Sequence, residues 1–149
     1  MLEGQLITAV NKYLTKLVHH QSMTSASLTQ NGTPDRYYDG PAGDLWVEYK
    51  MLDAMPRSGL VGFVDAKKKG CYSPLQYEWM MRRYSNSLAH ARRNVVGIVG
   101  LPNRTAVIQR TPTEWREGTS ITQAISLKEV GVWIDDFCSQ SYAPSAASS

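Results

Sequence analysis

The stretch Gly32–Lys50 reads GTPDRYYDGPAGDLWVEYK, and the interpretation of the whole chain starts from it. The segment Asp44–Met51, which extends one residue past this stretch, interleaves apolar and charged residues. Such a pattern is typical of a β-strand with two different faces. The preceding run Asp39–Gly43 is rich in turn formers, and Arg36–Tyr38 can form a shorter strand. We therefore expect the two strands to pair as a hairpin.

Three charged side chains meet at this hairpin. Residues two apart on a strand share one face, so Glu48 and Lys50 project side by side. The hairpin also brings Asp35 toward Glu48. Two carboxylates beside a lysine suit a hard divalent cation such as Mg²⁺, which prefers oxygen ligands and shares its shell with phosphate. A metal there can lower the pKa of a water, and Lys50 could orient that water or offset developing charge, as phosphodiester hydrolysis requires.

Pro34-Asp35, twelve intervening residues and Glu48-Tyr49-Lys50 resemble the motif of the PD-(D/E)XK nuclease superfamily. The resemblance implies a restriction-endonuclease-like core, an α/β fold in which helices flank a central mixed β-sheet. It also implies Mg²⁺, replaceable by Mn²⁺, held by Asp35, Glu48 and the Tyr49 carbonyl. Each part alone is common on solvated strands and in turns, so the inference depends on their conjunction.

Glu3 is a further candidate metal ligand. It lies on a predicted amphipathic helix that covers the sheet, with an apolar stripe at spacings of three and four formed by Leu2, Leu6, Ile7, Val10, Leu14 and Leu17. Members of the superfamily often place an acid on the first helix, close to the metal. Glu3 fits equally well as a first-turn acid that complements the helix dipole, and both interpretations stay open.

Gln76 lies in the first turn of another predicted helix. Ser73 can cap this helix, Pro74 suits its first position, and its apolar stripe includes Leu75, Trp79 and Leu88. A Ser-Pro-x-Gln helix after the Glu-x-Lys strand resembles the virus-type replication-repair nucleases and the phage and archaeal junction-resolving nucleases, where a helix glutamine lies beside the catalytic lysine. Their connection is commonly shorter than the 22 residues of Met51–Tyr72. Gln76 also fits an ordinary exposed position.

Several basic residues are candidate DNA contacts, namely Arg57, Lys67, Lys68, Lys69, Arg82 and Arg83. Lysine and arginine bind phosphates with an affinity that depends on salt and not on sequence. The lysine run fits a solvated turn equally well. Arg82 and Arg83 diverge by about 100° on a helix, which predicts a broad basic surface.

The rest of the chain predicts a buried strand at Asn94–Leu101 and a returning strand at Thr105–Gln109. We expect Trp115 to lie in a polar loop, and a capping box at Ser126–Glu129 to begin the last helix. We expect one domain over residues 1–138 and a disordered tail over 139–149. The net charge of +3 is compatible with a polyanionic partner without requiring one. Two cysteines without a pairing pattern, no signal-peptide region and no long apolar run predict a soluble intracellular protein. The resemblance implies the cytoplasm of a bacterial or phage-infected host cell.

These features predict a magnesium-dependent endonuclease that acts on double-stranded DNA as a homodimer or larger assembly, without a membrane. A homing-type enzyme that cuts one long site is favoured, because reading base edges requires extra elements such as the insertion after Lys50. A repair or junction-resolving nuclease that reads branched structure is the alternative. A non-catalytic DNA-binding accessory protein on the same scaffold is an alternative of another class. Intact Asp35, Glu48 and Lys50 argue against it.

Overall fold

The computed structural model describes residues 1–23, 32–62, 72–86 and 93–140. A six-stranded mixed sheet forms its centre, with strand order β1-β2-β3-β5-β6-β8, and a two-stranded sheet pairs β4 with β7. The elements are α1 Glu3–Asn11, β1 His19–Ser22, β2 Arg36–Gly40, β3 Gly43–Met51, β4 Leu60–Val61, α3 Pro74–Asn86, β5 Val95–Gly100, β6 Thr105–Gln109, α4 Pro112–Glu117, β7 Thr119–Ser120, the 3₁₀ helix η2 Ile121–Gln123, β8 Ile125–Ser126 and α5 Leu127–Ser139.

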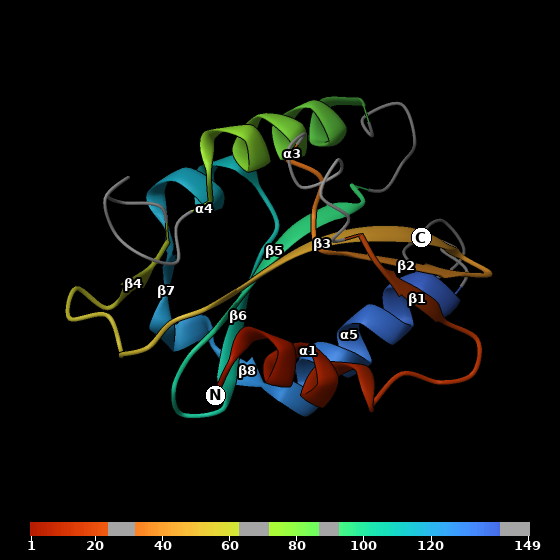
Figure 1. Ribbon diagram of the computed structural model, residues 1–149, viewed down its shortest axis with the longest axis horizontal. Coiled ribbons are helices and arrows are strands. Elements are labelled where there is room, and N and C mark those ends of the chain that lie inside the picture. The colour runs from red at the N-terminus through yellow and green to blue at the C-terminus, as the bar shows by residue number, and fades with distance from the viewer. Residues whose placement is uncertain (24–31, 63–71, 87–92, 141–149) are drawn as a thin grey trace, which may run out of the picture.

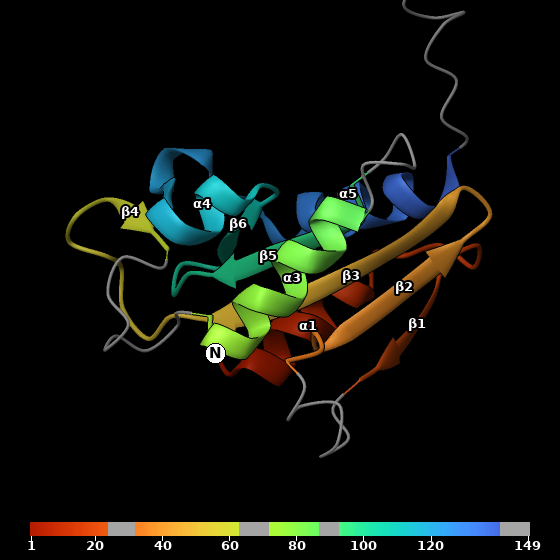
Figure 2. The ribbon, with the colours of Figure 1, turned by 90° about the horizontal axis from the view of Figure 1, so that it is seen from above.

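The sheet lies between two layers of helices (Figure 1). Helices α1 and α5 cover one face, and α3 crosses the other (Figure 2). Strands β2 and β3 pair antiparallel around Pro41-Ala42, whereas β3 pairs parallel with β5. The predicted hairpin, the mixed sheet and the flanking helices are therefore confirmed.

Strand β3 separates an apolar face from a polar one. Leu45, Val47 and Tyr49 are fully buried in the main core, where side chains of α1 and α5 pack against them. The alternate residues face α3, because Trp46 packs with aromatic residues of that helix and Glu48 bonds to Gln76. The two-residue period of a strand thus anchors β3 by one face and presents its charged residues on the other.

Helix α1 is shorter than predicted. Its stripe Leu6, Ile7 and Val10 is buried as expected, but the helix ends at Asn11 and Leu17 is 57% exposed. A tertiary contact explains the end: the buried carboxylate of Asp135 on α5 accepts hydrogen bonds from the Thr15 backbone N–H at 2.7 Å and its hydroxyl at 2.9 Å. These bonds hold the chain after α1 in a turn.

Helix α3 begins as predicted at Pro74, and the Ser73 hydroxyl accepts a hydrogen bond from the Gln76 backbone N–H. Its apolar stripe differs from the predicted one, because Leu75 is 50% exposed and Met80 is the buried residue. Leu88 lies outside the described residues.

The segment that follows β3 packs against β6 and β7, which come later in the chain. Gln109 is fully buried on β6, where its side chain donates to the Val61 carbonyl and accepts from the Tyr72 hydroxyl, each at 2.7 Å. The prediction of a loop around Trp115 was wrong. Trp115 is buried in α4, and its indole N–H donates to the Gln109 carbonyl.

A tight turn joins β5 to β6. Leu101 and Thr105 close it through a backbone hydrogen bond of 2.8 Å, and Arg104 adopts a left-handed φ of 64°. Glycine normally takes such a position in a hairpin loop, and a residue with a Cβ is strained there by roughly 1–2 kcal/mol. The geometry of the turn alone would therefore favour glycine over arginine at position 104.

Helix α5 starts with the predicted capping box, in which Ser126 and Glu129 bond to each other's backbone N–H groups. It extends through Ser139, one residue into the predicted tail, and residues 141–149 lie outside the described part. Among the described residues, no helix has the length and apolarity that crossing a membrane requires.

Candidate active site

Glu48, Lys50 and Gln76 come together on the α3 side of β3. The Lys50 ammonium lies 3.5 Å from Glu48 Oε2, and the Gln76 amide donates to the same oxygen at 2.9 Å. Glu48 is only 1% exposed, whereas the Lys50 side chain is 20% exposed. A buried carboxylate is thus held between a helix amide and an ammonium at the rim of the site.

Asp35 approaches the same site from the loop before β2. Its carboxylate accepts a hydrogen bond of 3.1 Å from the backbone N–H of Tyr49, the residue between Glu48 and Lys50. The loop is also fixed at Gly32, whose φ is 78° and where a Cβ would collide with the carbonyl oxygen of Leu75. Only glycine fits both the conformation and the close approach to α3.

The candidate site brings the carboxyl groups of Asp35, Glu48 and Glu3 close together, and Glu48 is almost fully buried there. Burial, the charge of Asp35 and hydrogen bonding to it raise the pKa of Glu48 to about 9, although the Lys50 ammonium acts in the opposite direction. Burial and Asp35 also raise the pKa of Glu3, which Lys50 lowers. The two glutamates therefore interact electrostatically with the same aspartate and lysine, so the first turn of α1 lies next to this site. Its proximity does not remove the helix-dipole explanation for Glu3.

A divalent metal fits the donors that face the site. Glu48 Oε1 is buried and has no hydrogen-bond partner among the described residues, and such an orphaned acceptor is costly unless a cation or donor occupies it. Across the described part of the chain, no group of three His, Cys, Asp or Glu side chains has the arrangement of a preformed metal cage. Magnesium is often held by only one or two carboxylates and completes its shell with water and phosphate, so a cage is not required.

The arrangement can support hydrolysis of a phosphate ester. Asp35 and Glu48 would hold a hard cation, which would supply charge stabilisation at the phosphate and a more acidic water. Lys50, at the exposed rim, is the residue placed to hold a water oxygen or to balance charge that develops on the phosphate. These roles remain predictions.

Gln76 connects the site to the cap of α3. Its side-chain oxygen accepts from the Ser73 backbone N–H at 2.9 Å, while its nitrogen donates to Glu48. The amide thus completes a capping box and fixes the orientation of the buried carboxylate. Gln76 is best described as a positioning residue.

Gln76→Ala should lower both the apparent affinity for Mg²⁺ and the cleavage rate, roughly 10–100-fold, because residues that orient metal ligands have effects of that size. Ser73→Ala is the matched control. It removes the same helix cap, at a cost of about 1 kcal/mol in stability, but leaves the bond between Gln76 and Glu48 intact. A magnesium titration of DNA cleavage, with urea unfolding of both variants, separates the two effects. Equal activity losses in the two variants would reduce Gln76 to a capping residue.

The predicted DNA contacts are only partly placed by the structure. Arg57 and Arg82 are exposed, whereas Arg83 is half-buried and its Nε donates to the Asn94 side chain at 3.1 Å. Lys67–Lys69 lie outside the described residues. Arg83 therefore has a structural role beside any contact with DNA, and the DNA contacts of this set remain predictions.

Two features around the site were not predicted from the sequence. On the far face of the sheet, the hydroxyls of Tyr38 and Tyr49 lie 2.6 Å apart, and Asn11 accepts from Tyr38 at 2.7 Å. This buried network ties β2, β3 and α1 together directly beneath the site. The second feature is the contact of Gly32 with α3. The inward-facing positions of Tyr38 and Tyr49 on their strands could have been predicted from the sequence pattern. Their hydrogen-bond partner Asn11 on α1 could not.

No protein-family model and no curated protein matches the sequence. Among solved structures, the chain is similar to Hjc, a Holliday junction resolvase from the hyperthermophilic archaeon Archaeoglobus fulgidus. The similarity has a TM-score of 0.51 and 12% sequence identity, and it covers 89% of this chain and 97% of the other. The chain thus shares the fold of Hjc over nearly its whole length.

Proposed function

We propose that this protein is a divalent-metal-dependent DNA endonuclease that recognises branched DNA, as a junction-resolving or repair enzyme. The observation that carries the proposal is the convergence of Asp35, Glu48, Lys50 and Gln76 on the face of a fold like that of Hjc. The convergence supports the chemistry, and the likeness of the fold supports the substrate class.

The described start of the insertion after Lys50 gives no support to a homing-type enzyme, and residues 63–71 lie outside the described residues. That expectation treated the insertion after Lys50 as an element that enters a DNA groove. The first part of the insertion instead forms β4, which pairs with β7, and the Gly59 carbonyl accepts from the Ile121 N–H. A strand that pairs with another part of the same protein, as β4 does with β7, has less backbone freedom to adapt to a DNA groove. Branch recognition by shape is supported instead by the likeness of the fold to that of Hjc.

The mechanism assigns separate tasks to the residues of the site. Hydrolysis requires a water to attack the phosphorus atom while a sugar oxygen departs. Asp35 and Glu48 would position the cation that stabilises this phosphate, and Lys50 would hold the attacking water or stabilise the charge on the phosphate oxygens. Gln76 keeps the Glu48 carboxylate in place. A protein that only bound DNA would have no chemical need for this set.

Symmetry suggests how two strands would be cut. A four-way junction presents strands of like sequence and polarity in symmetric pairs, and a two-fold dimer places identical sites in a matching arrangement. We therefore propose a homodimer as the active form.

A single assay tests the proposal. The protein is incubated with a labelled immobile four-way junction and with linear duplexes of the same arm sequences, with Mg²⁺ or with a chelator. We expect cleavage only with the metal, and at least about tenfold faster on the junction, which corresponds to about 1.4 kcal/mol of preference. Two junctions of unrelated sequence should be cut at similar positions relative to the branch. Cutting that follows one sequence, in linear and branched DNA alike, would restore the homing-type interpretation.

A further inference from the structure

Three residues on neighbouring strands form a row across the sheet, on the side of α3. Glu48 on β3 is the register partner of Gly97 on β5, and Gly97 is in turn the partner of Gln109 on β6. Residues that lie directly opposite each other share one face of a sheet. Adjacent strands are about 4.8 Å apart, so Gln109 lies roughly 10 Å from the candidate metal ligand Glu48.

Tyr72 fills the gap that Gly97 leaves in this row. The Tyr72 hydroxyl lies where a Cβ at position 97 would stand, and the ring carbon Cζ is 2.6 Å from that point. The hydroxyl donates to Gln109 Oε1 at 2.7 Å, and both residues are buried. Because the Gln109 amide nitrogen donates to the Val61 carbonyl, its oxygen is the atom that faces Tyr72. Glycine at position 97 is therefore what lets this tyrosine reach β6.

The same tyrosine comes directly before the cap of α3. Ser73 follows it in the chain, and the backbone N–H of each of Ser73 and Gln76 donates to the side chain of the other. The Gln76 side-chain nitrogen then donates to Glu48. The beginning of α3 is thus attached to the sheet at two points, to β6 through Tyr72 and to β3 through Gln76.

We propose that Tyr72 and Gln109 are positioning residues of the candidate metal site. Their hydrogen bond holds the first turn of α3 at a fixed place over the sheet, so that Gln76 reaches Glu48 and keeps its carboxylate oriented for a divalent metal. This assignment rests on the proposed nuclease function. A single attachment would let the turn rotate about the contact between Gln76 and Glu48, whereas a second attachment on another strand fixes its direction.

The bond between Tyr72 and Gln109 does more than hold α3 in place. Met80 in the middle of α3 is fully buried in an apolar cluster, so apolar packing already stabilises this helix on the sheet. A buried hydrogen bond adds only modestly to stability, because it replaces bonds to water. It adds direction, since a satisfied buried polar contact favours one arrangement of the groups that it joins. The bond lies at the end of α3 that carries Gln76, which connects this direction to the site.

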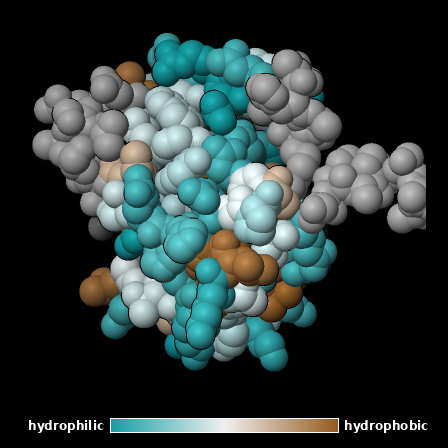
Figure 3. Space-filling model, turned by 90° about the vertical axis from the view of Figure 1, so that its right-hand side faces the viewer, coloured by the Kyte–Doolittle hydropathy of each residue, from teal (hydrophilic) through white to brown (hydrophobic). Residues whose placement is uncertain are grey.

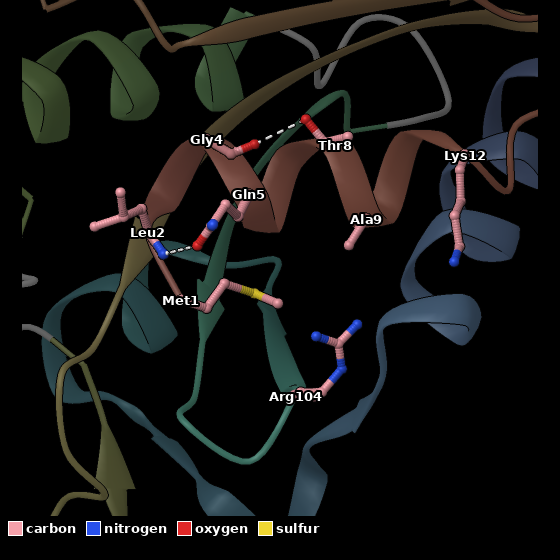
Figure 4. A pocket seen from close by; sticks show the side chains of 8 residues that line it. All are labelled: Met1, Leu2, Gly4, Gln5, Thr8, Ala9, Lys12 and Arg104. Carbon is pink, nitrogen blue, oxygen red and sulfur yellow. Dashed lines mark hydrogen bonds between the residues drawn. The ribbon is translucent and has the colours of Figure 1, made fainter.

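The surface features give weaker cases. The described residues that line an open groove beside α1 include the cations Lys12 and Arg104 but not Glu3, and they identify no occupant (Figure 4). The face that includes the sheet edge near β1 is mostly hydrophilic, with small separate hydrophobic areas (Figure 3). Such scattered areas are normal on a monomer and do not identify a partner.

The test measures the Mg²⁺ concentration for half-maximal cleavage of a labelled four-way junction by the full-length chain. Tyr72→Phe removes the hydroxyl and keeps the ring. It should raise this concentration by about 3–10-fold, less than Gln76→Ala, because it acts one step further from the metal. The KM for the junction should stay within about twofold of the wild type, since no contact with DNA is lost. Tyr37→Phe is the matched control: it removes a tyrosine hydroxyl that donates to Asp44, and it should leave the Mg²⁺ requirement unchanged.

A double-mutant cycle separates positioning from general destabilisation. In a Gln76→Ala background the turn no longer holds Glu48, so adding Tyr72→Phe should change the Mg²⁺ requirement by less than about twofold. Gly97→Ala tests the same contact from the other side, because its Cβ displaces the Tyr72 hydroxyl. It should raise the Mg²⁺ requirement to a similar extent as Tyr72→Phe. Stabilisation of each variant by Mg²⁺ in urea unfolding gives the same comparison without DNA.

The possible outcomes distinguish this assignment from the proposed function. A wild-type Mg²⁺ requirement in both Tyr72→Phe and Gly97→Ala, with normal cleavage by the wild type, would overturn the positioning role and keep the nuclease. An equal increase in Tyr37→Phe, or effects of Tyr72→Phe and Gln76→Ala that simply multiply, would overturn it as well. A wild type that cuts no DNA, but whose stabilisation by Mg²⁺ is weakened by Tyr72→Phe, would reject the proposed function and keep the positioning role.

Discussion

Lys50→Ala is expected to lower the rate of DNA cleavage by roughly 10²–10⁴-fold while the protein stays folded, since that is the usual effect of losing a group that acts on the transition state. The ammonium is at the rim of the site, 3.5 Å from Glu48 and 20% exposed, so its removal leaves no large cavity. Its loss also removes the cation that counteracts the raised pKa of Glu48. Metal binding would then have to displace a more tightly held proton.

Single-turnover cleavage of a labelled junction, with circular dichroism and urea unfolding, measures the effect. Lys128→Ala removes an exposed lysine on α5 and should cut at the wild-type rate. Lys50→Arg keeps the charge but replaces a compact ammonium by a planar group, so it should remain strongly impaired. Cleavage by Lys50→Ala within a few-fold of the wild type would reject the assignment of this site.

The hairpin and its strand were predictable because every signal for them is local. Turn formers at Asp39–Gly43 and the two-residue period of β3 determine which residues share a face, and the structure places Glu48 and Lys50 accordingly. The start of α3 was equally readable from Ser73 and Pro74. Local chemistry thus predicted the strands and the helix start that bring Glu48, Lys50 and Gln76 together, while the roles of these residues remain predictions.

The errors occur where a distant residue decides the local structure. The end of α1 depends on Asp135, which is 120 positions away from Thr15 in the sequence. Trp115 is buried because β6 offers it the Gln109 carbonyl as a partner. Neither contact leaves a periodic signal in the sequence near the residue that it affects. The left-handed conformation of Arg104 was not predicted for a local reason: glycine is the residue expected at such a φ, and arginine is not.

The geometry of Glu48 predicts that function and stability oppose each other in this protein. Glu48 is buried beside Asp35, its Oε1 has no hydrogen-bond partner in the described part of the chain, and its pKa is raised from 4.5 to about 9. A pKa raised in the folded state contributes stability that is fully present below about pH 4.5 and is lost as the pH rises toward 9. In the absence of metal, the folded protein must therefore keep a proton on Glu48 or bear an unfavourable charge.

Glu48→Gln is expected to abolish cleavage and to stabilise the metal-free protein at pH 8, because the neutral amide keeps a partner in Gln76 without needing that proton. The gain at pH 8 should be on the order of 2–4 kcal/mol, and it should shrink to below about 1 kcal/mol at pH 5, where the wild type holds its proton at little cost. Urea unfolding in chelator at the two pH values measures both gains. Glu78→Gln, at an exposed acid on α3, is the control and should change stability little at either pH.

Magnesium adds a second test of the same argument. A cation that binds the folded wild type at Asp35 and Glu48 should stabilise it at pH 8, whereas Glu48→Gln should respond weakly, because stabilisation by a ligand follows its affinity for the folded state. A variant that is less stable than the wild type at pH 8 in chelator, or equally stabilised at pH 5 and pH 8, would show that the Glu48 carboxyl ionises normally in the fold. An equal response of the wild type and Glu48→Gln to Mg²⁺ at pH 8 would instead show that the metal binds elsewhere on the chain.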